Sequence, residues 1–289
     1  MRERITIILT WRCFHDKATG LGLIAQNQKN QNGLKKIFNQ LATGKRINRA
    51  SDDAAMLSIA KELEKQVRGF QVVENNVGDA MAALRIADGA SSSISDMMQR
   101  QRELAIQASN GTLNQEQRNS LNQEFQALSS EIDRTAQAAQ YNTQSLLNGD
   151  SPLSDGTGEI QVGTGTAEAD QVNMPESDLT SENLAINNLD ISNPANINAA
   201  ISQLDTAMNQ VNTTRTNQGA LYNRFQSTQD NAANTRINTA AALSQAEDLD
   251  YAEGTAEQAR QSILAQTNTM ALRNFNEIAR NNVMSLLGA

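Results

Sequence analysis

The sequence has very few of the residues that usually build catalytic and metal sites. It contains one Cys and one His among 289 residues, so no intrachain disulfide can form. Zinc sites and catalytic triads draw heavily on these two residue types. Aromatic residues are only 3% of the chain, which is thin for a globular enzyme core. Because long helices can pack through Ala, Leu, Ile and Met instead, we expect a helical protein that is not an enzyme and holds no cofactor or metal.

Basic charge and long apolar runs are scarce as well. The formal net charge is −8, whereas a protein that binds duplex DNA needs a basic face to displace counterions. No apolar run approaches the roughly 18–20 residues of a membrane span. The start of the chain, MRERITIILTWRCF, has an apolar run too short for a good signal peptide, and no small-residue cleavage site follows it. We expect neither a nucleic acid nor a membrane as partner.

Helix-breaking residues are concentrated in one window of the chain. All three prolines lie there and glycines crowd its first part: Pro152, Pro175 and Pro194, with Gly149, Gly156, Gly158, Gly163 and Gly165. Proline stops helices and glycine weakens them, so residues 151–194 are predicted to be non-helical. Within this window, GEIQVGTGTAEADQVNM has short alternating runs around a Gly/Thr centre. Such runs are typical of a small β-hairpin.

The chain on both sides of this window has heptad spacing. Apolar residues recur there three, four or seven positions apart: Leu63, Val67, Phe70, Val77, Met81 and Leu84; Leu121, Phe125, Leu128 and Ile132; Ile201, Leu204, Met208 and Val211. This spacing places the side chains on one stripe of a helix, which must be buried against another helix. We therefore predict a mainly α fold, a long antiparallel helical bundle or coiled coil with a small β-hairpin insertion.

The stretch LATGKRINRASDDAA looks at first like a phosphate-binding loop. Such a loop needs an earlier Gly and a Ser or Thr directly after the Gly-Lys pair, but Arg46 follows Gly44 and Lys45 here. A joint between two helices explains the stretch better. Gly44 suits the left-handed position just past a helix end. Ser51 suits the N-cap of the next helix, with Asp52 and Asp53 in its first turn.

Both ends of the chain carry apolar helical patterns. The segment from Thr255 to Leu287 is amphipathic, and Leu34, Phe38 and Leu41 mark the end of a similar helix near the start. Such terminal helices can pack back on the bundle, fray, or bind other molecules.

Five carboxylates lie close together just before the last helix: Glu247, Asp248, Asp250, Glu253 and Glu257. Paired carboxylates can hydrolyse glycosides, but only across a cleft with sugar-stacking aromatics, and Tyr251 is the only aromatic nearby. A joint with acidic residues on the N-terminal turn of the last helix is the better interpretation.

Several of these stretches, in the same order, resemble bacterial flagellins. ATGKRINRASDDAA resembles the family's Ser-Gly-x-Arg-Ile-Asn-x-Ala-x-Asp-Asp-Ala-Ala signature, and QRQRELAIQASNGT resembles another characteristic stretch. SSEIDRTAQAAQYNTQSLLNG, GEIQVG, EDLDYAEGTAE and the ending ILAQTNTMA…NNVMSLL are similar to further family motifs. The resemblance covers roughly residues 25–175 and 200–289, a set of motifs more specific than any single one.

The resemblance implies a structural subunit of the bacterial flagellar filament, without the family's outer variable domains. Such a subunit is secreted through the flagellar type III route and polymerises with itself into the helical propeller used for motility. Its partners are other copies of itself, an export chaperone, the filament cap and the hook-junction proteins. In flagellins the terminal helices form a coiled coil in the filament's inner core and are disordered in the free monomer. The inner-core residues implied here are Leu34, Phe38, Leu41, Ile263, Leu264, Met270, Phe275, Ile278, Val283, Leu286 and Leu287.

The resemblance also implies a contact patch on the bundle. In some flagellins the matching positions contact a neighbouring subunit and the host Toll-like receptor that senses flagellin. Here they are Gln99, Arg100, Arg102, Glu103, Leu104 and Glu124. The alternative is a solvated charged helix face with Leu104 in the bundle core.

We expect four parts along the chain. They are an atypical N-terminal arm (1–24), a terminal coiled-coil domain (25–44 and 255–289), a helical bundle domain (45–150 and 195–254) and the hairpin and loop insertion (151–194). The arm does not look like a flagellin start. It holds the chain's only Trp, Cys and His, namely Trp11, Cys13 and His15. Two metal ligands are too few for a structural zinc site, and a divergent arm or a start-site or reading-frame error each explains the segment.

Two other functions compete with that of a filament subunit. The related hook–filament junction protein shares the Gly-Lys-Arg-Ile-Asn joint, but it usually has Pro-Ser-Asp-Asp-Pro where this chain has ASDDAA. A coiled-coil adaptor that does not polymerise would instead be stable as a monomer or dimer, with ordered ends.

Overall fold

We describe the protein from a computed structural model. It describes residues 2–153, 155, 157–175 and 177–287, and no side chain of residues 2–19, 282–283 or 285–287. The helices are α1 (Arg2–Thr43), α2 (Ala54–Ala108), α3 (Gln115–Ala138), α4 (Pro194–Glu247) and α5 (Tyr251–Leu287). The short strands are β1 (Gln140–Tyr141), β2 (Gln144–Ser145), β3 (Glu159–Gln161) and β4 (Gln171–Asn173), with a 3-10 turn η1 (Glu168–Asp170) before β4. None of the described helices is long and apolar enough to span a lipid bilayer.

The chain divides into two compact units. Residues 1–64 and 241–289 form one, which we call the terminal unit, and residues 65–240 form the other, the bundle unit. The predicted domain boundaries, at residues 44–45 and 254–255, lie within the terminal unit, and α1 continues as one helix through the proposed end of the arm at residue 24.

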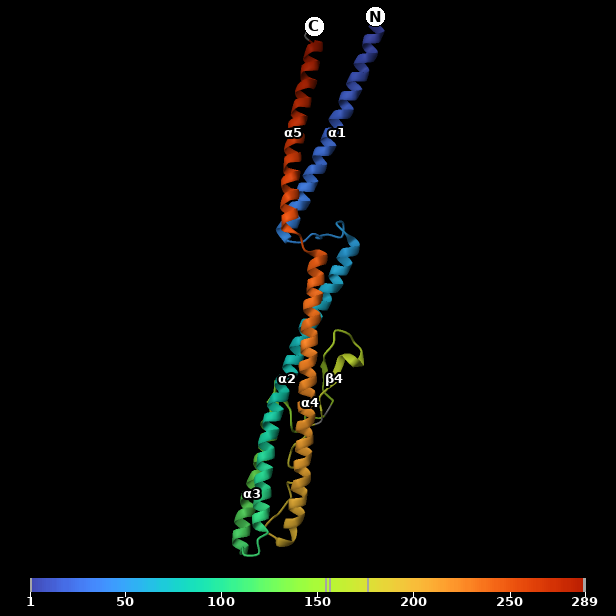
Figure 1. Ribbon diagram of the computed structural model, residues 1–289. Helices are drawn as coiled ribbons and strands as arrows, with labels where there is room; N and C mark the ends of the chain where they lie inside the picture. Colours follow the sequence, from blue (N-terminus) through green and yellow to red (C-terminus); the bar gives the residue numbers. More distant parts are fainter. Residues whose placement is uncertain (1, 154, 156, 176, 288–289) are drawn as a thin grey trace. The chain divides into compact units, whose positions relative to one another are not determined.

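Helices α2, α3 and α4 lie side by side in the bundle unit (Figure 1). Ion pairs join successive levels of α2 and α4, from Arg236–Glu74 (2.7 Å) to Arg102–Asp205 (2.7 Å). The two helices are therefore antiparallel, because residue numbers fall on one as they rise on the other. Their apolar stripes face inward and bury fully Ile94, Leu104, Phe125, Ile132, Leu204 and Phe225. The predicted antiparallel helical bundle is confirmed.

Two β-hairpins cover part of the bundle unit. Strands β3 and β4 pair antiparallel, with Ile160 opposite Val172, which confirms the predicted hairpin. Val172 and Met174 then pack with α2 and α4 residues in one core cluster. The β1–β2 hairpin was not predicted. It turns through Asn142 (φ 50°) and Thr143 (φ 66°), two left-handed residues like those of a type I′ turn.

The terminal unit is an antiparallel pair of helices, α1 and α5 (Figure 1). A Cβ atom built on Gly20 would lie 2.8 Å from the Phe275 ring, and one built on Gly254 would lie 3.1 Å from a Leu41 methyl. Gly20 precedes Leu41 on α1 whereas Phe275 follows Gly254 on α5, so the two helices run in opposite directions. The glycine at each site allows this close approach.

Candidate functional site

The facing sides of α1 and α5 form a narrow seam with heptad spacing. Its positions are 20, 23, 27, 30, 34, 37 and 41 on α1 and 254, 258, 261, 265, 268, 272, 275 and 279 on α5, all half-buried or buried. Residues 33, 40, 257, 262 and 271 beside them are half-buried or buried as well. Steps of three and four are those of a coiled coil. Of the predicted inner-core residues, Leu34, Leu41 and Phe275 lie half-buried on this seam.

The seam mixes large apolar side chains with small and polar ones. Gly, Ala, Asn and Gln occupy many of its positions, and three polar atoms buried there have no hydrogen-bond partner: Asn27 Oδ1, Asn30 Nδ2 and Gln261 Oε1. A buried polar group without a partner costs roughly 1–3 kcal/mol. These unpaired groups therefore reduce the stability that the contact gains from its apolar side chains.

A further set of large apolar side chains on α1 and α5 lies exposed outside the seam. Among the predicted inner-core residues, Phe38, Ile263, Leu264, Met270 and Ile278 are between 38% and 63% exposed. Leu21, Ile24 and Met284 add further exposed apolar side chains on the same two helices. The side chains of Val283, Leu286 and Leu287 lie outside the described residues, as do those of Trp11, Cys13 and His15. Apolar surface gathered in this way is typical of a face that another protein covers.

A joint connects α1 to α2 and α4 to α5. Gly44 follows the last residue of α1 with φ 71°, as predicted. Backbone hydrogen bonds then tie the two connections together, from Arg46 N–H to Glu247 O (2.7 Å) and from Leu249 N–H to Gly44 O (2.9 Å). The Lys45 ammonium donates to Glu247 Oε1 at 2.9 Å. The Gly-Lys pair therefore serves a structural joint.

The start of α2 differs from the prediction. We expected Ser51 to cap it, but the helix begins at Ala54, and the carboxylate of Asp53 accepts the N–H of Met56 at 3.0 Å. Asp53 is thus the N-cap, because an N-cap side chain accepts a hydrogen bond from the backbone two or three residues on. Ser51 lies exposed in the preceding turn. Both residue types cap helices well, so the sequence does not choose between them.

Asp250 gives α5 its N-cap. Its carboxylate accepts the N–H of Ala252 at 2.8 Å, and Glu253 lies in the first turn. Tyr251 ties this end to α1, because its hydroxyl donates to Leu41 O at 2.9 Å. Glu257 accepts from the Arg260 guanidinium at 2.8 Å, which holds the pKa of that carboxyl below its ordinary value. The acidic stretch therefore caps and starts a helix, as the joint interpretation predicted.

Asp52 organises the loop between α1 and α2. One carboxylate oxygen accepts the N–H groups of Asn48 (3.2 Å) and Arg49 (3.1 Å), and the other pairs with the Lys36 ammonium at 3.1 Å. Partial burial raises the pKa of this carboxyl, but the hydrogen bonds from Lys36, Asn48 and Arg49 outweigh burial, so the pKa lies below its ordinary value. The ionised form is therefore the one that the fold stabilises.

This pKa shift predicts how stability changes with pH. A carboxyl with a depressed folded-state pKa adds stability above its unfolded pKa, about 3.9, and loses it as pH falls through the folded pKa. We expect Asp52→Asn to lower the free energy of unfolding by about 1 kcal/mol at pH 7. The difference from wild type should shrink below about pH 4. Urea titrations followed by circular dichroism between pH 2.5 and 7 measure it, and a difference that is constant over this range would contradict the assignment.

The predicted contact patch lies on α2 and α3. The Arg100 guanidinium donates to Glu124 at 2.9 Å and to Glu103 at 3.2 Å, so one cation joins the two helices. Arg102 pairs with Asp205 of α4 at 2.7 Å. These residues are exposed or half-exposed, and ion pairs between exposed groups add little stability. The charged groups are thus more important as a surface than as a source of stability.

Two residues within this stretch belong to the core. Leu104 is fully buried, so its side chain supports the patch from below and is not available to a partner. Sequence reasoning missed Gln101, which is also fully buried. Its amide donates to Phe125 O (3.2 Å) and to the Ser129 hydroxyl (2.7 Å). This polar contact fixes α3 against α2 beneath Arg100 and Glu124.

Comparisons with known proteins agree with this arrangement. Residues 19–152 match the family model of the bacterial flagellin N-terminal helical region, and residues 201–287 match that of the bacterial flagellin C-terminal helical region. A flagellin of Halalkalibacterium halodurans is 35% identical, over 86% of this chain and 90% of that protein. A flagellin of Bacillus subtilis is 30% identical, over 92% of this chain and 97% of that protein.

Two solved structures are similar as well. The crystal structure of Bacillus cereus flagellin is 32% identical with a TM-score of 0.48, covering 58% of this chain and 94% of that one. A putative flagellar hook-associated protein from Vibrio parahaemolyticus is 15% identical with a TM-score of 0.54, covering 68% of this chain and all of that one. The second likeness concerns the fold alone.

Proposed function

The chain belongs to the bacterial flagellin family, and from this premise we propose that helices α1 and α5 are the surfaces through which its copies join. The protein is a structural subunit of the extracellular flagellar filament and polymerises with itself. Flagellins are structural proteins, and flagellin relatives at 30–35% identity favour this function over that of a hook–filament junction protein.

One observation carries the proposal. The α1–α5 seam covers only part of the apolar side chains of these helices, and others stay on the outside, with Ile263, Met270 and Ile278 each more than 60% exposed. Fully burying such a side chain is worth roughly 1.5–3 kcal/mol. Neighbouring copies would supply that burial. Residues 25–44 and 255–289 would then form the inner core of the filament, and residues 45–150 and 195–254 the shell around it.

A weak seam also makes assembly switchable. A helix pair that gains most of its apolar contacts from neighbours is marginal in the free subunit and becomes stable on assembly. Export through a narrow channel requires an unfolded chain, so marginal ends suit the flagellar type III route. An export chaperone would cover these faces before export, and the filament cap and the hook-junction proteins would meet the same helices outside the cell.

The charged patch on α2 and α3 is a second proposed contact. Gln99, Arg100, Glu103 and Glu124 are exposed, and the ion pairs of Arg100 hold its guanidinium in a fixed place. A fixed surface of mixed charge contributes more to the specificity of binding than to its affinity. A neighbouring subunit would bind here, and a host Toll-like receptor would recognise the same residues in the dissociated subunit.

Seeded polymerisation tests the proposal. We expect the purified full chain to grow long filaments in negative-stain electron microscopy after a precipitating salt or filament seeds are added. A chain lacking residues 255–289 should form none. If neither chain forms filaments and the terminal helices of the monomer already resist protease, the protein is the non-polymerising adaptor.

A further inference from the structure

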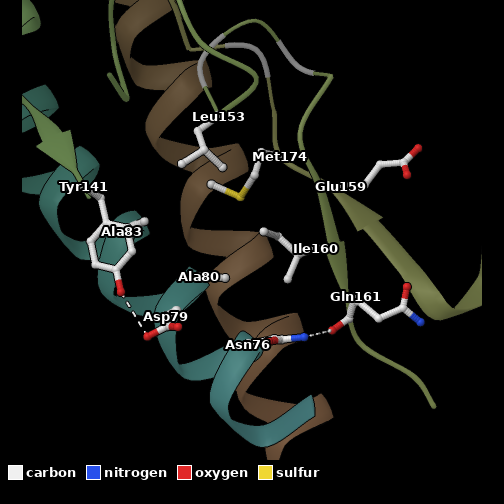
Figure 2. A pocket seen from close by; sticks show the side chains of 10 residues that line it. All are labelled: Asn76, Asp79, Ala80, Ala83, Tyr141, Leu153, Glu159, Ile160, Gln161 and Met174. Atoms are coloured by element: carbon white, nitrogen blue, oxygen red, sulfur yellow. Dashed lines mark hydrogen bonds between the residues drawn. The ribbon is translucent and has the colours of Figure 1, made fainter. Parts of the chain in front are cut away.

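A cavity of about 310 Å³ lies in the bundle unit between α2, the β3–β4 hairpin and the β1 strand (Figure 2). Its walls are apolar, formed by Ala80, Ala83, Leu153, Ile160 and Met174. Five further residues bring polar groups to it: Asn76, Asp79, Tyr141, Glu159 and Gln161. A volume near 300 Å³, apolar walls and a few converging polar groups are the features of a small-ligand site.

The donors that line this cavity are largely used by the protein itself. The Tyr141 hydroxyl donates to Asp79 Oδ1 at 3.0 Å, and Figure 2 shows this contact at one side of the cavity. The Gln161 amide donates to Gly163 O (2.9 Å) and to Gly165 O (2.8 Å). The Asn76 amide donates to Gln161 O at 3.4 Å.

The groups that remain free are acceptors. Asp79 keeps its second carboxylate oxygen, and Asn76 keeps its amide oxygen. None of the described residues that line the cavity is Lys or Arg, so the charge of Asp79 is not compensated from within this lining. Its contact with Tyr141 raises the pKa of the Tyr141 hydroxyl, which keeps that group protonated and donating. The cavity therefore presents a negative, acceptor-rich wall beside an apolar one.

We propose that this cavity binds an organic cation with a short aliphatic stem. The cationic head would donate to Asp79 and Asn76, and the stem would lie against Leu153, Ile160 and Met174. Charge-assisted hydrogen bonds are roughly twice as strong as neutral ones, and the exposed Asp79 carboxylate is accessible to the head group. A free alkylguanidine or alkylamine has this chemistry, and so does the Arg or Lys side chain of a neighbouring copy.

Glu159 provides a matched control, because it also lines the cavity but its carboxylate points away from the other lining side chains (Figure 2). Asp79→Asn and Glu159→Gln each remove one negative charge. Asn at position 79 keeps an oxygen that can accept from Tyr141, so the fold should persist in both variants. Only Asp79→Asn should affect the bound head group.

The test titrates the full-length monomer with n-butylguanidinium and follows the methyl resonances of Ile160 and Met174 by NMR. We expect both resonances to shift in a saturable way in wild type and in Glu159→Gln. Asp79→Asn should bind about tenfold more weakly, which corresponds to the roughly 1.4 kcal/mol of a hydrogen bond to a charged group. The neutral isostere n-butylurea should bind more weakly than n-butylguanidinium. No saturable shift, or equal binding by wild type and Asp79→Asn, would overturn the proposal.

A second arm distinguishes the two sources of the cation. Filament growth is measured with and without n-butylguanidinium, in wild type and in Asp79→Asn. Inhibition in wild type alone identifies the side chain of a neighbouring copy as the natural occupant. Unchanged growth at a saturating ligand concentration identifies a free small molecule.

Discussion

Replacing Ile263, Met270 and Ile278 together with glutamine is expected to abolish filament growth while leaving the monomer folded. The three side chains are 61–63% exposed in the single chain, and changes at exposed positions usually alter stability by less than about 0.5 kcal/mol each. Burial in the filament would stabilise each by roughly 1.5 kcal/mol or more. Together they should raise the critical concentration for growth at least about a thousandfold, because about 1.4 kcal/mol is a factor of ten.

Sedimentation of filaments from a concentration series measures the critical concentration. Thermal unfolding of the monomer measures whether its stability has changed. The matched control replaces exposed polar residues of the same helix, Thr267, Asn274 and Asn281, with glutamine. That variant should polymerise like wild type. If both triple variants polymerise normally, the outward apolar side chains of α5 are not the contacts between copies.

Replacement by alanine should mainly destabilise the monomer at Phe125 and mainly weaken filament growth at Phe38. Phe125 is fully buried in the bundle core, whereas Phe38 is 53% exposed on α1. Phe125→Ala should lower the free energy of unfolding by roughly 3–5 kcal/mol, because it leaves a cavity in a packed core. Phe38→Ala should change that free energy by less than about 0.5 kcal/mol but raise the critical concentration roughly tenfold or more.

Urea unfolding of the two monomeric variants and sedimentation of their filaments separate these effects. Each variant is the control for the other, since both lose the same ring. A large loss of monomer stability in Phe38→Ala would show that its ring is buried within the free subunit. A normal critical concentration in that variant would place α1 outside the contacts between copies.

Local chemistry made some elements predictable from the sequence. Gly44 could be placed past a helix end because few other residues adopt a positive φ there. The absence of proline from the flanks and its presence at residues 152, 175 and 194 located the non-helical window. The β1–β2 hairpin was missed because Asn142-Thr143 lacks the Gly that usually marks a two-residue turn.

Contacts between distant segments could not be predicted in the same way. The α1–α5 seam gives an interrupted hydrophobic signal, because Gly20, Asn27, Asn30 and Gln261 occupy positions where a coiled coil usually has Leu or Ile. Exposed apolar residues such as Ile263, Met270 and Ile278 lie on α5 outside the seam, so the amphipathic pattern alone does not locate the contact with α1. The cavity beside Asp79 was missed as well. It depends on Tyr141 and the β3–β4 hairpin, which meet α2 only in the folded chain.

Hydrogen exchange of the α5 amides between residues 263 and 278, compared in monomer and filament, tests the central claim most directly. Exchange reports the free energy of local opening. If neighbouring copies complete the burial of α1 and α5, these amides should exchange at least about a hundredfold more slowly in the filament, which corresponds to roughly 2.7 kcal/mol. Equal protection in monomer and filament would contradict the account, because the terminal helices would then be fully stable within the single chain.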